Sequence, residues 1–219
     1  MIYSAEEKAR REKVVGVLRS AYQGSRSALS FASIFQLLVA VILSAQTNDN
    51  QVNAITAPLF AKFPAAADFA ALSEPELEGY IKTCGLYKNK AKNIIASSRL
   101  ICEKFEGEVP RNRQDLMSLP GVGRKSANVV LSVGYGLPAL AVDTHVFRVS
   151  RRLGLASAAD AEGVEEELCA FLPQELWGDA HHWLIWHGRK VCRARNPHCS
   201  LCPVKDCCPS ACTAACPGV

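Results

Sequence analysis

Cysteines crowd one end of this 219-residue chain, in a spacing that metal sites use. Cys192, Cys199, Cys202 and Cys208 follow one another with six, two and five residues between them. Four thiolates brought together by short loops suit either tetrahedral zinc or an iron–sulfur cube. Structural zinc sites usually come as two C-x2-C pairs, and this pattern offers a single close pair. The spacing therefore favours an iron–sulfur cluster.

The remaining cysteines are expected to play other parts. Cys207 lies beside Cys208 and could take the fourth ligand position in its place, a choice that spacing alone does not decide. Cys212 and Cys216 follow in the tail and have no assigned role. Three cysteines in the body of the chain are expected to be small buried side chains rather than ligands: Cys84, Cys102 and Cys169.

A glycine-rich turn followed by a lysine forms a second candidate site. Residues 119–123, LPGVG, predict a tight turn between two helices, where backbone N–H groups can contact a phosphate. Lys125 falls in the first turn of the second helix, where the helix dipole and the adjacent Arg124 both disfavour the ammonium form. The neutral amine is the form that attacks carbon and makes Schiff bases. A solvated lysine or a simple phosphate contact also fits these local features.

An aspartate provides the third candidate. Asp143 stands directly before a segment with apolar residues at helical spacing, so we expect it to be an N-cap. A capping carboxylate can still serve in acid–base chemistry, or stabilise a developing cation, if its other oxygen faces a cleft. Asp143 is therefore both a structural and a chemical candidate.

The elements that must position these residues are predicted to be helical throughout, so the expected fold class is all-α. The apolar run over residues 34–43 is typical of a central buried helix, and Asp49 is expected to cap the next one. No segment alternates over six or more residues, so no sheet is predicted. The expected helices cover about residues 5–23, 34–43, 49–60, 73–81, 87–105, two short segments around 120–123, then 143–153, 160–172 and 174–187.

Composition places the chain among ordinary globular proteins and excludes several classes. Hydrophobic residues make up 49% and charged residues 21%, and the longest apolar stretch, residues 31–45, is too short and interrupted to span a membrane. The N-terminus is charged where a signal peptide would be apolar, so we expect a reducing, cytoplasmic location. A net charge of +4 permits a nucleic-acid partner. The basic run 189–195 could shield thiolates or meet phosphates.

Five segments, taken in order, resemble the endonuclease III family of DNA glycosylases within the helix-hairpin-helix superfamily. The resemblance covers nearly the whole chain, and the cysteine spacing is similar to the family's [4Fe–4S] loop. The segments are AVILSAQTND (residues 40–49), CGLYKNKAKNI (84–94), LPGVGRKSANVVL (119–131), AVDTHVFRV (141–149) and HHWLIWHGR (181–189).

The resemblance implies an architecture of two helical lobes. Residues 27–136 would form a six-helix barrel domain that ends in the helix-hairpin-helix. Residues 1–26 would join residues 137–219 in a second domain, which carries the [4Fe–4S] cluster. The cluster's ligands would be the four cysteines of the spacing described above.

The resemblance also implies a base-excision-repair glycosylase with AP lyase activity, which removes oxidised pyrimidines from duplex DNA. The partner would be double-stranded DNA that contains a damaged base or an abasic site; the enzyme would be a monomer with no membrane partner. Lys125 would attack C1′ of the sugar and form a Schiff base, and β-elimination would then cut the strand. Asp143 would stabilise the cationic sugar or help to deprotonate the lysine.

Further residues are assigned by the same resemblance. Gln46 would fill the space that the flipped nucleotide leaves, and Leu86 would wedge into the opposite strand. Gly121 and Gly123 would anchor a phosphate, and His145 would lie near the DNA. Two other functions stay open: a glycosylase for another lesion or mismatch, and a non-catalytic DNA-binding or electron-transfer protein. Adenine-excising relatives lack a lysine at the position of Lys125, which disfavours that activity.

Overall fold

A computed structural model of the chain describes residues 4–211, and every element in that range is helical. Eleven α-helices and no strand occur there, which confirms the predicted all-α fold. The chain divides into two compact units, Ser27–Leu137 and a second unit that joins Met1–Arg26 to Pro138–Val219. None of the helices described is both long and apolar enough to cross a bilayer.

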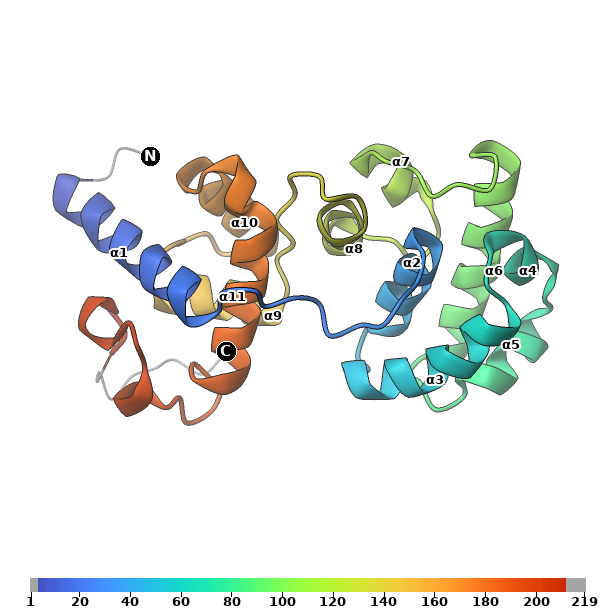
Figure 1. Cartoon of the computed structure of the whole chain (residues 1–219), viewed down its shortest axis with the longest axis horizontal. Coiled ribbons are helices and arrows are strands. Elements are labelled where there is room, and N and C mark those ends of the chain that lie inside the picture. The colour runs from blue at the N-terminus through green and yellow to red at the C-terminus, as the bar shows by residue number, and fades with distance from the viewer. Residues whose placement is uncertain (1–3, 212–219) are drawn as a thin grey trace. The chain divides into compact units, whose positions relative to one another are not determined.

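The unit Ser27–Leu137 is built around one buried helix. This helix, α2, was expected from its apolar run, and every residue from Phe35 to Leu43 is buried. It packs against α3, α6 and α8 (Figure 1). The helices of the unit are α2 (Ile34–Leu43), α3 (Asp49–Lys62), α4 (Ala66–Ala71), α5 (Glu74–Ile81), α6 (Tyr87–Lys104), α7 (Arg113–Ser118) and α8 (Arg124–Val129), with a π-helical turn at Val130–Gly134.

Two details of the helix starts differ from the sequence prediction. Asp49 was expected to cap α3, but the cap is Asn48, whose Oδ1 accepts a hydrogen bond from the N–H of Gln51 at 2.9 Å. Either residue type caps a helix well, and the helix begins one residue before the position predicted. The short helix α4 was not predicted; it is held by Phe69, which is fully buried. Its first turn is capped by Asp68.

The second unit contains α1 (Ala5–Ala21), α9 (Thr144–Arg152), α10 (Ala161–Phe171) and α11 (Trp177–Lys190), followed by short 3-10 turns at Cys199–Leu201 and Lys205–Cys207. The N-terminal helix shares a core with helices more than a hundred residues away. Val14 and Leu18 of α1 are buried with Val146 and Val149 of α9 and with Leu184 of α11. The chain's first helix therefore supports the cysteine-rich end.

Arg10 links α1 directly to that end of the chain. Its Nη1 donates to the carbonyl oxygens of Leu153 and Cys207, both at 2.8 Å, and its Nη2 donates to that of Gly154 at 3.0 Å. The Glu7 carboxylate holds the same guanidinium at 2.7–2.8 Å. A charged residue of α1 thus fixes the loop that precedes Cys208.

Replacing Glu7 by Gln should lower the free energy of unfolding at pH 7 by less than about 1 kcal/mol, since the pair is partly exposed. Hydrogen bonds from Arg10 and Arg11 lower the pKa of Glu7 from 4.5 to about 2. A carboxyl with a lowered pKa stabilises the fold above its unfolded-state pKa and loses that contribution as the pH falls to 2. Urea unfolding midpoints at pH 7, 5 and 3 test this. An unchanging difference between the wild type and Glu7→Gln would contradict it; Glu12→Gln, in an exposed pair, is the control.

Candidate functional site

The turn between α7 and α8 places two glycines in different situations. Gly121 has a φ of +80°, and a Cβ there would lie 2.9 Å from the side chain of Asn93, so this position requires glycine. Gly123 has an ordinary φ of −90°, and no atom of residues 4–211 lies within 4 Å of where its Cβ would be. The fold of the turn therefore explains Gly121. Gly123 instead leaves open the approach to the first amides of α8.

Lys125 is the second residue of α8 and is half-buried. Its helix is anchored in the protein interior by Ala127 and Asn128, which are fully buried. Asn128 also accepts a hydrogen bond from Arg113 of α7 at 3.0 Å. Ser97 of α6 donates to the carbonyl of Pro120 at 2.7 Å, which ties the turn to its neighbouring helix. The backbone that carries Lys125 is thus held on both sides.

Asp143 caps α9, as the sequence predicted. Its backbone is extended, and its Oδ1 accepts a hydrogen bond from the N–H of Val146 at 2.7 Å. The cap occupies one carboxylate oxygen, so Oδ2 is the atom that chemistry would use. Lys125 lies on α8 in the unit Ser27–Leu137, whereas Asp143 begins α9 in the other unit.

His145 is half-buried in the first turn of α9. Its Nδ1 lies 3.2 Å from Nη2 of Arg148, a buried side chain of the same helix. A Cβ on Gly188 of α11 would come within 3.1 Å of the same ring nitrogen. The imidazole is therefore held where α9 and α11 pack together.

Gln46 and Leu86 share an uncommon backbone conformation. Both have positive φ, 56° for Gln46 and 58° for Leu86, and both side chains are exposed. A residue other than glycine rarely adopts this left-handed region, and such positions cluster at functional sites. The two are brought together: a Cβ on Gly85 would lie 3.6 Å from the carbonyl oxygen of Gln46. Both residues were candidates from the sequence, but their shared left-handed conformation was not predicted.

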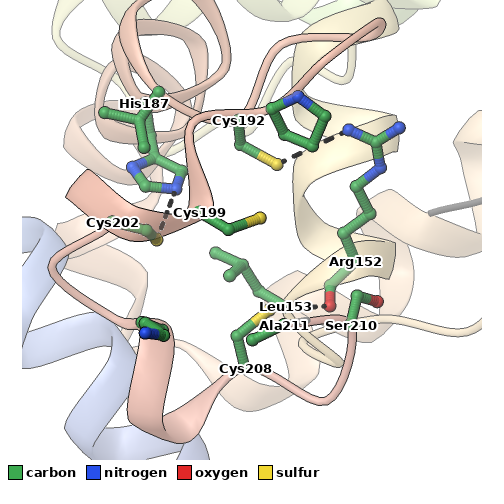
Figure 2. A pocket seen from close by; sticks show the side chains of 12 residues that line it. Arg152, Leu153, His187, Cys192, Cys199, Cys202, Cys208, Ser210 and Ala211 are labelled. Carbon is green, nitrogen blue, oxygen red and sulfur yellow. Dashed lines mark hydrogen bonds between the residues drawn. The ribbon is translucent and has the colours of Figure 1, made fainter. Parts of the chain in front are cut away.

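Four cysteines surround one pocket at the end of the second unit. Cys192, Cys199, Cys202 and Cys208 line about 360 Å³ of space, part of it open to solvent. Figure 2 shows their side chains arranged around it. Within residues 4–211, no group of three or more His, Cys, Asp and Glu side chains is already arranged to hold a metal ion.

The other cysteines lie apart from this pocket. Cys207 does not line it, and its carbonyl oxygen accepts a hydrogen bond from Arg10 at 2.8 Å. Cys84 is buried, and Cys102 and Cys169 are half-buried in the body of the fold. Two tail cysteines lie outside the described residues: Cys212 and Cys216.

Two buried arginines of α9 hold the loop that carries the first of the four cysteines. Arg152 donates to Sγ of Cys192 at 3.8 Å (Figure 2). It also donates to the carbonyl of Arg193 at 2.7 Å. Arg148 donates to the carbonyl of Cys192 at 3.0 Å. From the sequence, the neighbouring run 189–195 could either shield the thiolates or meet phosphates; Arg193 of this run is exposed. The cations that shield this loop come from another helix.

A buried histidine faces the pocket from α11. Nε2 of His187 lies 3.7 Å from Sγ of Cys202, and its Nδ1 lies 3.0 Å from the hydroxyl of Tyr22. Burial lowers the pKa of His187 to about 4 and raises that of Tyr22 to about 12, so both are neutral at pH 7. If Tyr22 donates to Nδ1, the ring hydrogen is on Nε2 and points at the sulfur of Cys202.

Burial also acts on the thiols themselves. It raises the pKa of Cys202 and of Cys208, because an apolar environment disfavours the thiolate. A positively charged group that binds the four sulfurs would offset this cost. The four sulfur donors around one pocket therefore fit a thiolate-bound metal group.

The chain is similar in sequence to a known protein family and to several known proteins. The family described as HhH-GPD superfamily base excision DNA repair protein matches residues 39–174. Endonuclease III of Escherichia coli (strain K12) is 48% identical over 204 residues, which span 92% of this chain and 95% of that protein. Endonuclease III of Bacillus subtilis (strain 168) is 51% identical over 175 residues, 80% of each chain.

Solved structures give the same result for the fold. A trapped endonuclease III–DNA covalent intermediate superimposes with a TM-score of 0.90 at 42% identity, covering 96% of this chain and 97% of that one. A non-covalent endonuclease III–DNA complex gives a TM-score of 0.89 over the same shares. A thermostable thymine-DNA glycosylase gives 0.83, but at 23% identity it shows a common fold alone.

Proposed function

The chain belongs to the endonuclease III family, and from this premise we propose which of its residues carry out the family's reactions. It is a base excision repair enzyme, a DNA glycosylase with AP lyase activity. The observation that carries this conclusion is an identity of 48% over 92% of the chain. The fold shared with a thymine-DNA glycosylase, at 23% identity, does not favour a mismatch-specific activity.

We propose that the substrate is double-stranded DNA with an oxidised pyrimidine or an abasic site. Similar proteins have been solved with DNA, both non-covalently bound and as a covalent intermediate. The damaged nucleotide must leave the base stack before a side chain can reach its sugar. We further propose that the enzyme works as a monomer, with Ser27–Leu137 and the remainder of the chain as its two domains.

Lys125 is the proposed nucleophile. Its Nζ forms a bond to C1′ while the bond from C1′ to the base breaks, and the base leaves with that electron pair. The sugar ring then opens to give an imine between C1′ and Nζ. The imine acidifies the C2′ hydrogens, so loss of one proton expels the 3′ phosphate and cuts the strand. The position of Lys125 in the first turn of α8, directly after the glycine turn, supports this role.

Asp143 is the proposed electrostatic partner in the same reaction. A carboxylate stabilises the positive charge that develops on the sugar, or accepts a proton from the nucleophile. Its Oδ1 is used by the cap of α9, so we assign the chemistry to Oδ2.

Substitutions of Asp143 should separate its two roles. Asp143→Ala should lower the free energy of unfolding by about 1 kcal/mol, because the cap is lost. Asp143→Asn retains an oxygen that can cap, so its stability should match the wild type while its base-excision rate falls. Thermal unfolding and single-turnover excision measure the two effects. An asparagine variant with wild-type excision would contradict the chemical role.

The remaining DNA contacts are proposed from position and conformation. Gln46 and Leu86 project from adjacent strained turns and are exposed, which suits a plug and a wedge in an opened duplex. Gly121 and Gly123 place backbone amides at the start of α8, where a phosphate is favoured. His145 is proposed to contact DNA near Asp143.

We propose a [4Fe–4S] cluster bound by Cys192, Cys199, Cys202 and Cys208. Support comes from the pocket that the four cysteines share and from their spacing in the sequence. When bound, the cluster would serve as a structural cross-link and take no part in the cleavage. Arg148 and Arg152 would then stabilise the thiolates and the loop beside them.

Borohydride trapping tests the proposed function. The native protein, mixed with a duplex that contains an abasic site, should form a covalent adduct when the imine is reduced. A panel of duplexes, each with a single lesion, should show excision of oxidised pyrimidines and little excision of a normal thymine opposite guanine. Failure to trap an adduct would remove the lyase mechanism, and preference for the mismatch would overturn the substrate.

A further inference from the structure

A lysine of α6 is buried, and no carboxylate within residues 4–211 pairs with it. Lys90 is 4% exposed, and its Nζ donates to the carbonyl oxygens of Leu43 at 2.8 Å and Ala45 at 2.6 Å and to Oγ1 of Thr47 at 3.1 Å. These three acceptors match the three N–H groups of an ammonium. Lysine is almost never this buried unless it is paired, so the position requires a reason.

The acceptors of Lys90 frame a single turn. Leu43 is the last residue of α2, and Ala45 follows just after the helix. The last carbonyl groups of a helix have no partner within it and carry the negative end of its dipole. Thr47 lies on the other side of Gln46. The ammonium therefore holds the backbone both before and after the left-handed Gln46.

Lys90 also lies one helical turn from Leu86, the proposed wedge. Its backbone N–H donates to the carbonyl oxygen of Leu86 at 3.1 Å, so Leu86 sits at the start of the same helix. A second bond joins the two turns, from Nε2 of Gln51 to the carbonyl of Thr83 at 2.6 Å. Side chain and backbone of Lys90 thus contact both strained turns.

Strain explains why such a link is needed. A left-handed residue other than glycine costs about 1–2 kcal/mol and persists only where its surroundings hold it. The side chains of Gln46 and Leu86 are exposed, so their own burial does not stabilise this conformation. The hydrogen bonds of Lys90 stabilise the backbone on both sides of Gln46 and the carbonyl group of Leu86.

We propose that Lys90 is a positioning residue that fixes Gln46 and Leu86 relative to each other, so that both enter the duplex together and the damaged nucleotide leaves the stack. This rests on the plug and wedge roles proposed above. Lys90 acts through the two turns and makes no DNA contact of its own, since its amine is enclosed by protein.

The test is Lys90→Met, which retains the length of the side chain and removes its donors. Base excision from duplex DNA should slow at least tenfold. The fluorescence rise of a 2-aminopurine placed opposite the lesion, which reports unstacking, should shrink. Borohydride trapping on a single-stranded abasic oligonucleotide needs no base to be displaced, so it should stay within twofold of the wild type. Lys104→Met, at the exposed other end of α6, should leave all three unchanged.

A milder variant covers the case in which Lys90→Met does not fold. Thr47→Val removes one of the three acceptors, so it should produce the same split between duplex and single-stranded substrates with a smaller slowing. Equal losses on both substrates would show a general structural defect and overturn the proposal.

A double-mutant cycle with Leu86→Ala shows whether Lys90 acts through the wedge. Lys90→Met should slow excision much less in the Leu86→Ala background than in the wild type, because coupled residues are not additive. Additive effects would overturn the role of Lys90 and leave the wedge intact. A Leu86→Ala enzyme with normal excision would instead remove the wedge role, and the present proposal with it, while trapping by Lys125 would stand.

Discussion

Lys125→Ala is expected to form no covalent adduct with an abasic duplex under borohydride, and to cut abasic DNA at least about 10³-fold more slowly than the wild type. Without the amine, no imine forms, and the C2′ hydrogens of the sugar are not acidified. The same variant should lose base excision, because the nucleophile that displaces the base is absent. Gel separation of the reduced adduct and single-turnover cleavage measure both losses.

The variant should still fold and bind DNA, which distinguishes a lost nucleophile from a lost structure. Lys125 is half-buried, whereas Ala127 and Asn128 anchor the helix, so its replacement leaves the packing of α8 in place. Lys104→Ala is the matched control and should trap normally. An adduct of undiminished yield in Lys125→Ala would mean that another amine attacks the sugar, and would remove Lys125 from the mechanism.

Local sequence signals predicted most of the helices because each signal acts within a few residues. The continuous apolar run produced α2, and Asp143 stands before α9 with its oxygen on the N–H of Val146. Helix α4 escaped prediction because six residues are too few to show a period. Its existence depends on Phe69, which is fully buried and packs edge-on against the ring of Phe35 in α2.

The residues of the candidate site also fall into those with a local sequence signal and those that depend on distant contacts. Lys125, Gly121 and the cysteines could be marked from type and spacing, because their signals are contiguous in the sequence. Arg148 and Arg152 could not, since they contact Cys192 from 44 and 40 residues away. No periodicity or motif encodes a contact across that separation. Only the packing of α9 against α11 brings it about.

The left-handed backbone conformation of Gln46 and Leu86 could not be predicted from the sequence either. The residue types give no sign of a positive φ, since neither Gln46 nor Leu86 is glycine or asparagine. The strain becomes intelligible only with Lys90, which is separated from Leu43 by 47 residues. A lysine in an amphipathic helix is expected to be exposed, so the burial of Lys90 could not be predicted from its residue type.

Cys208→Ser is expected to yield protein that has lost most of its iron and its brown colour, whereas Cys207→Ser should retain four irons per chain. The two cysteines are adjacent, but only Cys208 lines the pocket with the other three. Sγ of Cys208 lies 3.5 Å from the carbonyl of Arg152, on the inner side of the loop. A serine oxygen is a poorer ligand for iron than a thiolate is.

Cys207→Ser is a matched control because it makes the same change one residue away. Cys207 contacts Arg10 through its carbonyl oxygen, which the substitution leaves in place, so the loop keeps its link to α1. Iron analysis and visible absorbance report the cluster directly, and thermal unfolding reports the cross-link that it provides. Iron loss in Cys207→Ser with retention in Cys208→Ser would exchange their roles. A colourless wild-type protein that contains zinc would overturn the cluster itself, and would require the four sulfurs to close around a single ion.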